Sequence, residues 1–162
     1  MKKVSEELRY DGATIEQVHE MLADETFRKK VCDAQGVLRH TVTIEAAGEG
    51  MTVEIDQFQA AKGIPGFAKK FVGDEIHIVQ SEDWTSQEKG NISLVIPGKP
   101  GEITGTALLT EDPDGTTETV NLNAKVNIPM VGGKIEGLIT DLISKGLREE
   151  KKVGRAWLDG NR

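Results

Sequence analysis

Two short helices are indicated near the start of the chain by the spacing of apolar residues. Apolar side chains recur at i, i+3 and i+7 on one helix face, at Ile15, Val18 and Leu22. Thr14 and Gln17 have the spacing of a capping box at the start of this helix. Asp24 can cap a second short helix, and Gly36 suits the end of that helix.

Beyond residue 36 the apolar residues alternate, which is typical of strands with one buried face. The first alternating run places on one face Leu38, His40, Val42 and Ile44. The next run begins with Met51, Val53 and Ile55. In addition to an N-terminal strand, further strands are expected at Glu75–Trp84, Asn91–Ile96, Glu102–Glu111 and Thr117–Ile128. The segment from Ala60 to Gly73 is expected to be a loop with one helical turn that leans on the sheet.

A long helix is expected at the end of the chain. Pro129 stops the last strand, and apolar residues then recur at helical spacing from Lys134 to Leu158, a length of about 37 Å. The apolar stripe of this helix contains Ile135, Leu138, Ile139, Leu142, Val153 and Trp157. Because consecutive strands are joined by short turns, the sheet should be antiparallel. The predicted fold class is therefore α+β, with seven strands, a long C-terminal helix, and two short helices between strands one and two.

The composition fits one domain, residues 1–162, with a charged surface. The 27 acidic and 20 basic residues give a net charge of −7, which argues against nucleic acid and anionic membrane surfaces as partners. No apolar run approaches the roughly 20 residues that a membrane span needs, and MKKVSEELRY has no apolar stretch typical of a signal peptide. The single cysteine, Cys32, excludes an internal disulfide, so we expect a cytoplasmic protein.

Three local strings, together with this order of elements, resemble a known superfamily. The strings are Asp24-Glu25-Thr26-Phe27, Cys32-Asp33-Ala34-Gln35-Gly36 and Ile128-Pro129-Met130-Val131-Gly132-Gly133-Lys134-Ile135-Glu136. Over nearly its whole length the chain resembles the START-like (SRPBCC) helix-grip superfamily, and within it a bacterial family of unassigned function. The superfamily includes lipid-transfer domains, plant pollen-allergen-like proteins and bacterial polyketide cyclases. The resemblance implies a curved sheet that grips the C-terminal helix, with a cavity between them for apolar or amphipathic molecules.

Familiar motifs for cofactors and metals are incomplete in this sequence. Gly132-Gly133-Lys134 lacks the first glycine and the final hydroxyl residue of a phosphate-binding loop, and is interpreted as a strand-to-helix turn. Asp112-Pro113-Asp114-Gly115 would need an acid at Asn123 to close a calcium loop, and is interpreted as a hairpin turn. The three histidines have no zinc-binding spacing, and Cys32 is interpreted as a buried structural thiol. We therefore expect no cofactor and no metal.

Several positions allow both a structural and a functional interpretation. Strand alternation places His40 inward, where it is either a satisfied structural histidine or a pocket-lining group. Glu82 and Trp84 lie on the inward parity near a strand end, which could be the mouth of a cavity, although Trp84 also suits the core. Gly146, in the apolar stripe, either lets the helix approach a strand or leaves room for a ligand. Glu149-Glu150 is interpreted as part of a solvated helix segment.

Binding of a small hydrophobic or amphipathic, lipid-like ligand is the leading hypothesis, with His40 or Gln57 orienting its polar end. The alternatives are an enzyme of the cyclase or hydratase kind that uses the same cavity, and a structural or interaction domain with a filled core. A missing acid–base constellation favours binding over catalysis. The candidate ligand-binding residues are His40, Val42, Met51, Val53, Gln57, Ile78, Trp84, Leu122, Met130, Ile135, Leu138, Leu142 and Gly146.

Overall fold

In the part of the chain that the structure describes, seven strands form one antiparallel sheet in the order β1-β7-β6-β5-β4-β3-β2. The structure is a computed structural model that describes residues 1–61 and 63–162. The strands are β1 (Lys2–Asp11), β2 (Arg39–Ala47), β3 (Gly50–Ala60), β4 (Glu75–Trp84), β5 (Lys89–Val95), β6 (Glu102–Asp112) and β7 (Gly115–Lys125). Neighbours in the sheet are neighbours in the chain except at β1, which pairs with β7. The sheet is not closed, since β1 and β2 form its two edges.

Helices α1 (Ile15–Leu22) and α2 (Glu25–Ala34) connect the two edge strands. The predicted capping box is present, because Gln17 N–H donates to Thr14 Oγ1 and the Gln17 side chain accepts from Thr14 N–H. Asp24 caps α2, as its side chain accepts from the backbone of Thr26 and Phe27. Gly36 adopts a φ of 76° directly after α2, which turns the chain out of the helix into β2.

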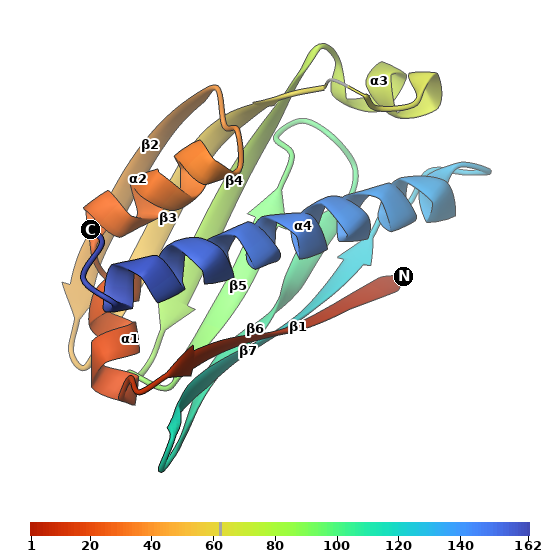
Figure 1. Cartoon of the computed structure of the whole chain (residues 1–162). Coiled ribbons are helices and arrows are strands. Elements are labelled where there is room, and N and C mark those ends of the chain that lie inside the picture. Colours follow the sequence, from red (N-terminus) through yellow and green to blue (C-terminus); the bar gives the residue numbers. More distant parts are fainter. Residues whose placement is uncertain (62) are drawn as a thin grey trace.

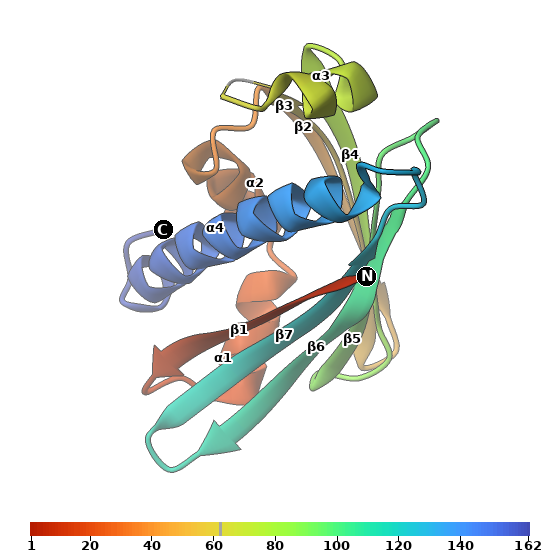
Figure 2. The same ribbon diagram turned by 90° about the vertical axis from the view of Figure 1, so that its right-hand side faces the viewer.

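The segment between β3 and β4 is more helical than the sequence analysis predicts. Helix α3 spans Gly66–Val72 and stands beyond the end of the sheet in Figures 1 and 2. Ala68 is its buried residue, whereas Phe67 is exposed on the other side. The expected stretch from Ala60 to Gly73 includes residue 62, which lies outside the described residues.

Helix α4 (Gly132–Leu158) crosses the concave face of the sheet, and Figure 2 shows the strands curving around it. Its C-terminal half packs between β1 and α2, with the Trp157 ring edge-on against Phe27 at 5.5 Å. The predicted α+β class, the antiparallel sheet, the paired short helices and the long C-terminal helix are confirmed. None of the described helices is both long and apolar enough to cross a membrane.

The densest part of the core lies beneath α1, α2 and the C-terminal half of α4. It includes Leu8, Val18, Phe27, Met51, Trp84 and Trp157. Toward the N-terminal half of α4, inward-facing residues of the sheet and the helix are only partly buried, among them Ile78, Ile92, Leu94, Ile139 and Ile143. This incomplete burial marks the place where the sheet and the helix do not fill the space between them.

Candidate ligand-binding site

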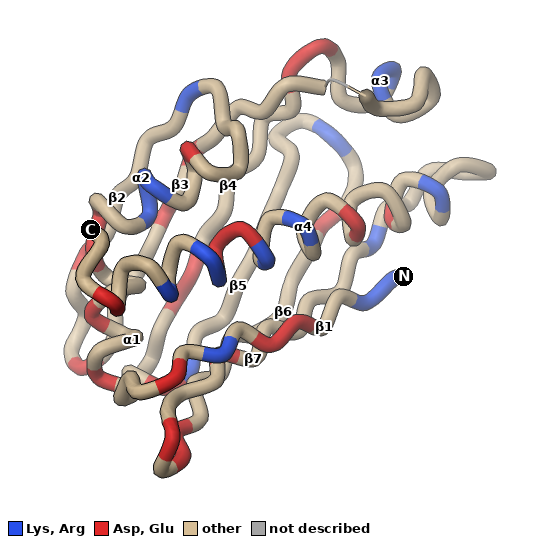
Figure 3. The backbone as a smooth tube through the Cα atoms, viewed as in Figure 1, with Lys and Arg blue, Asp and Glu red and all other residues tan. Residues whose placement is uncertain are grey.

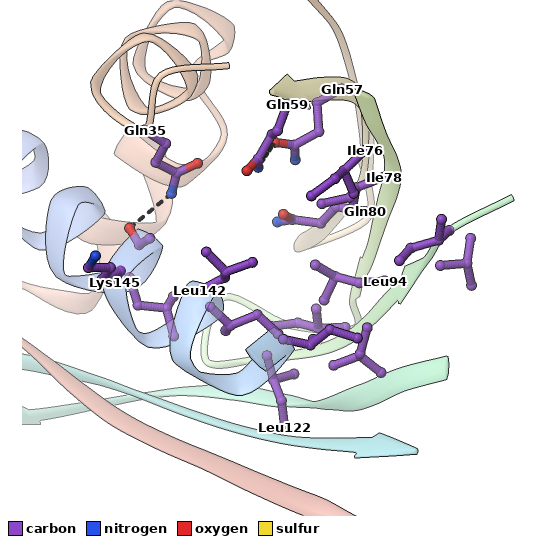
Figure 4. Close-up of a pocket in the computed structure, with 18 of the residues that line it drawn as sticks. Gln35, Gln57, Gln59, Ile76, Ile78, Gln80, Leu94, Leu122, Leu142 and Lys145 are labelled. Carbon is purple, nitrogen blue, oxygen red and sulfur yellow. Dashed lines mark hydrogen bonds between the residues drawn. The ribbon is translucent and has the colours of Figure 1, made fainter. Parts of the chain in front are cut away.

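A cavity of about 410 Å³ lies between the sheet and α4. Figure 4 shows side chains from both layers pointing into this space. Its apolar lining comes from β4, β5, β6, β7 and α4, and includes Ile76, Ile78, Ile92, Leu94, Ile103, Val120, Leu122, Ile135, Leu138, Ile139, Leu142 and Ile143. Helix α3 and the segment before it add Ile64, Ala68, Phe71 and Val72. The cavity is open where its lining is exposed, at Leu142 and Lys145.

Four glutamine side chains supply neutral polar groups at the wall. Gln57, Gln59 and Gln80 come from β3 and β4, and Gln35 comes from the end of α2 (Figure 4). The Gln59 amide donates to Gln57 Oε1 at 3.0 Å, and the Gln35 amide donates to the backbone oxygen of Gly146 at 2.9 Å. A few such groups in an apolar wall are the usual means of orienting a ligand.

The end of the cavity opposite α3 is buried and charged. Arg28, on α2, makes two parallel hydrogen bonds of 2.9 Å to the carboxylate of Glu82, on β4. Burial opposes the charged form of Glu82, but the charge of Arg28 and hydrogen bonds from Arg28, Trp84 and Gln80 outweigh it, so its pKa is lowered. Arg28 Nε also donates to the backbone oxygen of Leu22 at 2.7 Å, which fixes the guanidinium in place.

Two further acids, Glu118 on β7 and Glu150 on α4, face the same end of the cavity. Their exposed fractions are 3% and 9%. Burial raises the pKa of Glu150 to about 7, with Arg28 opposing the rise and Glu82 adding to it. Burial, and then repulsion by Glu150 and Glu82, raise the pKa of Glu118 well above its ordinary range. The interpretation of Glu149-Glu150 as a solvated segment is therefore wrong for Glu150.

The structure brings part of the predicted ligand-binding set to this cavity. The lining includes Gln57, Ile78, Leu122, Ile135, Leu138, Leu142 and Gly146. At Gly146, a Cβ atom would lie 3.1 Å from the Gln35 amide nitrogen. The glycine therefore makes room for the side chain of Gln35, which directly follows α2. Close approach to a strand backbone, one of the two expectations for this position, is not what the structure shows.

The other predicted residues lie elsewhere. Val42, Met51, Val53 and Trp84 pack into the core beneath α1 and α2. His40 faces α2, with Nε2 3.4 Å from Asp33 Oδ1, and is not part of the cavity lining. Met130 is 99% exposed in the turn before α4, with a φ of 74°.

Glu82 and Trp84 do not mark the mouth of the cavity. Both are buried, and Trp84 Nε1 donates to Glu82 Oε1 at 2.8 Å. The expectation of a mouth at this strand end is wrong, because α1 and α2 cover it and the Arg28 guanidinium occupies the space beside Glu82. Trp84 has the core role that was one of its two interpretations.

Sequence reasoning missed Arg28, Glu118 and Glu150, although a signal for the first two was present. On α2, Arg28 precedes Val31 and Cys32 by three and four residues, which places it on their helix face. Glu118 has the inward parity of the apolar residues that follow it on β7. Glu150 lies about 60° from Ile135 on a helical wheel, just outside the apolar stripe of α4, whereas Glu149 lies about 40° away on the other side, inside the stripe, so the wheel does not single out Glu150.

Metal and thiol chemistry find no support at this site. Among residues 1–61 and 63–162, no group of three or more His, Cys, Asp and Glu side chains could hold a metal ion. Cys32 is buried, and burial raises the pKa of its thiol to about 11, so the reactive thiolate is scarce at neutral pH.

Solved structures match the predicted fold. A Thermus thermophilus protein matches with a TM-score of 0.67 at 17% identity, over 95% of this chain and 94% of its own. The di-domain ARO/CYC protein StfQ from the steffimycin biosynthetic pathway matches with a TM-score of 0.67 at 13% identity, over 95% of this chain and 50% of its own. A START superfamily protein of Mycobacterium smegmatis matches with a TM-score of 0.58 at 13% identity, over 97% of both chains. The START-like helix-grip fold is thereby confirmed.

A family model establishes the family, and relatives of similar length are found in mycobacteria. Uncharacterised proteins of Mycobacterium tuberculosis and Mycobacterium bovis are each 25% identical to this chain over 166 residues, which covers 94% of both sequences. A family model described as a protein of unknown function, DUF2505, matches residues 5–158. The chain therefore belongs to the DUF2505 family.

Proposed function

We propose that this protein binds a small hydrophobic or amphipathic ligand between its sheet and α4, and acts as a carrier or binding protein. The observation that carries the proposal is the cavity of about 410 Å³ with a mainly aliphatic lining. This volume lies within the range of pockets that enclose small organic molecules. The superfamily names of the structural neighbours add support.

Burial of apolar surface would provide most of the binding free energy. Each Å² of apolar surface that leaves water contributes roughly 25 cal/mol. Leu122 and Leu138 offer such surface from the sheet and from the helix, and the ligand would enter past Leu142 and Lys145, where the wall is exposed. The amide groups of Gln57 and Gln80 stand at the wall and could accept or donate one hydrogen bond to the polar part of a ligand.

A cyclase-like enzyme is the second candidate, favoured by one observation. Glu150 lines the cavity with a pKa raised by burial to about 7, which suits a general acid or base at neutral pH. StfQ and a second structural neighbour, BexL, are described as ARO/CYC proteins. Under this function, Glu150→Gln would abolish turnover while the protein still bound its substrate.

Uptake of an apolar fluorescent dye tests the proposal. N-phenylnaphthylamine should gain fluorescence with the wild-type protein, because the dye enters an apolar environment. Ile78→Trp should reduce this uptake by roughly tenfold or more, since the indole projects from β4 into the cavity. Val79→Trp is the matched control, because Val79 is the next residue on the same strand and has outward parity.

Equal dye binding by the wild type and Ile78→Trp would place the dye outside the cavity and contradict the proposal. A wild-type protein that takes up no dye would contradict it as well. Circular dichroism of both tryptophan variants establishes whether each keeps the fold.

A further inference from the structure

Four charged side chains from four different elements meet at the buried end of the cavity. They are Arg28 of α2, Glu82 of β4, Glu118 of β7 and Glu150 of α4, and each is at least nine-tenths buried. Three acidic side chains therefore face one basic side chain in a place where water does not compensate the charge of an ionised group. This imbalance distinguishes the buried end from the aliphatic and amide-lined remainder of the cavity.

The single cation of the cluster is already engaged. Arg28 gives two hydrogen bonds of 2.9 Å to Glu82 and a third, of 2.7 Å, to the backbone oxygen of Leu22. Glu82 also accepts from Trp84 and Gln80. Arg28 and Glu82 thus form an internally satisfied pair with no net charge, and the remaining two acids have no cation of their own within this cluster.

Glu118 is the acid of this cluster that most clearly lacks a hydrogen-bond partner. Its Oε1 is buried and has no hydrogen-bond partner among the described residues. Inward parity on β7 directs this side chain toward the cavity, whose lining includes it. The hydroxyl of Tyr10, on β1, is likewise buried and without a partner within the described chain. Buried polar groups in native proteins are nearly always paired, so an exception in a cavity wall points to a ligand group.

We propose that Glu118 and Glu150 form a subsite for the protonated amine of an amphipathic ligand whose hydrocarbon part lies among the aliphatic residues of the cavity. This inference rests on the proposed function. An ammonium group carries three hydrogen-bond donors and a positive charge, and so could pair with the two acids, which have no cation of their own in this cluster. A carboxylate or phosphate head would instead meet like charges, and a hydroxyl would supply a donor without a charge.

Amine binding at this place should depend on pH. The titratable and charged groups that face the two acids are Tyr10 of β1, Arg28 and Cys32 of α2, and Glu82 of β4. Burial keeps Glu150 partly protonated near neutral pH, with a pKa of about 7, and favours the protonated form of Glu118 more strongly. The incoming ammonium stabilises the charged carboxylates, so binding should release protons, and affinity should rise between about pH 6 and about pH 8.

Calorimetric titration with decylamine, decanol and decanoate tests the subsite, because these probes share an alkyl chain and differ in the head group. At about pH 8 an alkylamine is protonated, as lysine is. Decylamine should bind the wild type roughly tenfold tighter than decanol, and decanoate should bind most weakly. Glu118→Gln and Glu150→Gln should each remove the preference for the amine and keep the affinity for decanol. Asp141→Asn, an exposed acid on α4 outside the cavity lining, is the control that should change nothing.

The result for decanol separates this inference from the proposed function. Binding of decanol or decanoate as tight as that of decylamine would overturn the amine subsite and leave the hydrophobic cavity in place. Failure of all three probes to bind would overturn both. If either glutamine variant failed to fold, the ranking of the three probes on the wild type would still decide whether the cavity prefers an amine.

Discussion

Gly154 is the residue that lets α4 lie directly against β1. A Cβ atom at this position would come within 2.7 Å of the ring of Tyr10, closer than real Cβ contacts. Tyr10 is almost fully buried and has little freedom to move away. The glycine therefore sets the distance between helix and sheet at the end of α4 that is farthest from the cavity opening.

Replacing Gly154 by alanine should destabilise the protein. The expected loss is about 1–2 kcal/mol, because overpacking at Tyr10 costs more than the gain in helix propensity returns. Urea unfolding measures the difference. Gly137→Ala is the control within α4, since its Cβ would meet only the end of the Lys2 side chain, and it should raise stability by up to about 1 kcal/mol. A Gly154→Ala protein as stable as the wild type would contradict the close contact.

The charged residues show what the sequence could and could not predict at this scale. Acidic and basic residues follow one another along α4 (Figure 3), and Glu149 and Glu150 look alike in the sequence. The helical wheel places Glu149 inside the apolar stripe and Glu150 just outside it, and burial of a carboxyl is unfavourable unless something compensates it. That compensation depends on Arg28, which lies more than a hundred residues away in the chain. A helical wheel of α4 alone therefore does not establish that Glu150 is buried.

At the scale of elements, the boundaries that follow from turn and cap chemistry were predictable. The capping box at Thr14, the glycine after α2 and the hairpin turn at Asp112-Pro113-Asp114-Gly115 all appear where the sequence places them. Each depends on residues a few positions apart, and such local interactions can be inferred without the fold. The covering of one sheet end by α1 and α2 is a tertiary feature, and for this reason the sequence left two interpretations open for Trp84, a core residue or the mouth of a cavity.

The burial of Glu150, on α4, should make stability depend on pH. The folded protein holds a proton at Glu150 up to about pH 7, whereas the ordinary pKa is 4.5. The contribution of Glu150 to the free energy of unfolding is therefore fully present below about pH 4.5. It is lost as the pH rises through about 7, and the loss amounts to about 3 kcal/mol.

Glu150→Gln removes this titration and should flatten the pH dependence. Near pH 8 the variant should be more stable than the wild type by up to about 3 kcal/mol, and near pH 5 the two should be similar. Urea unfolding at both pH values measures this, with Glu149→Gln as the control because the Glu149 side chain is 41% exposed. A wild type and Glu150→Gln that lose stability in parallel above pH 5 would show that Glu150 is not the group that titrates.

For the whole molecule, the order and periods of the elements predicted the α+β fold, while the cavity could be expected only by resemblance. Alternation shows which strand residues point inward, but it does not show whether they touch the helix. Ile78 and Val53 have the same inward parity on adjacent strands, yet Ile78 lines the cavity and Val53 packs in the core. The difference comes from where α2 covers the curved sheet, a property of the assembled layers.

The central claim is that the space between the sheet and α4 carries a hydrophobic or amphipathic molecule. Native mass spectrometry of the protein purified from its own host tests this most directly, followed by extraction of the same sample into organic solvent. The account predicts a species heavier than the chain alone and one extractable compound that accounts for the difference, lost or reduced in Ile78→Trp and retained in Val79→Trp. The mass of the bare chain in all three proteins, together with no uptake of N-phenylnaphthylamine by the wild type, would contradict it.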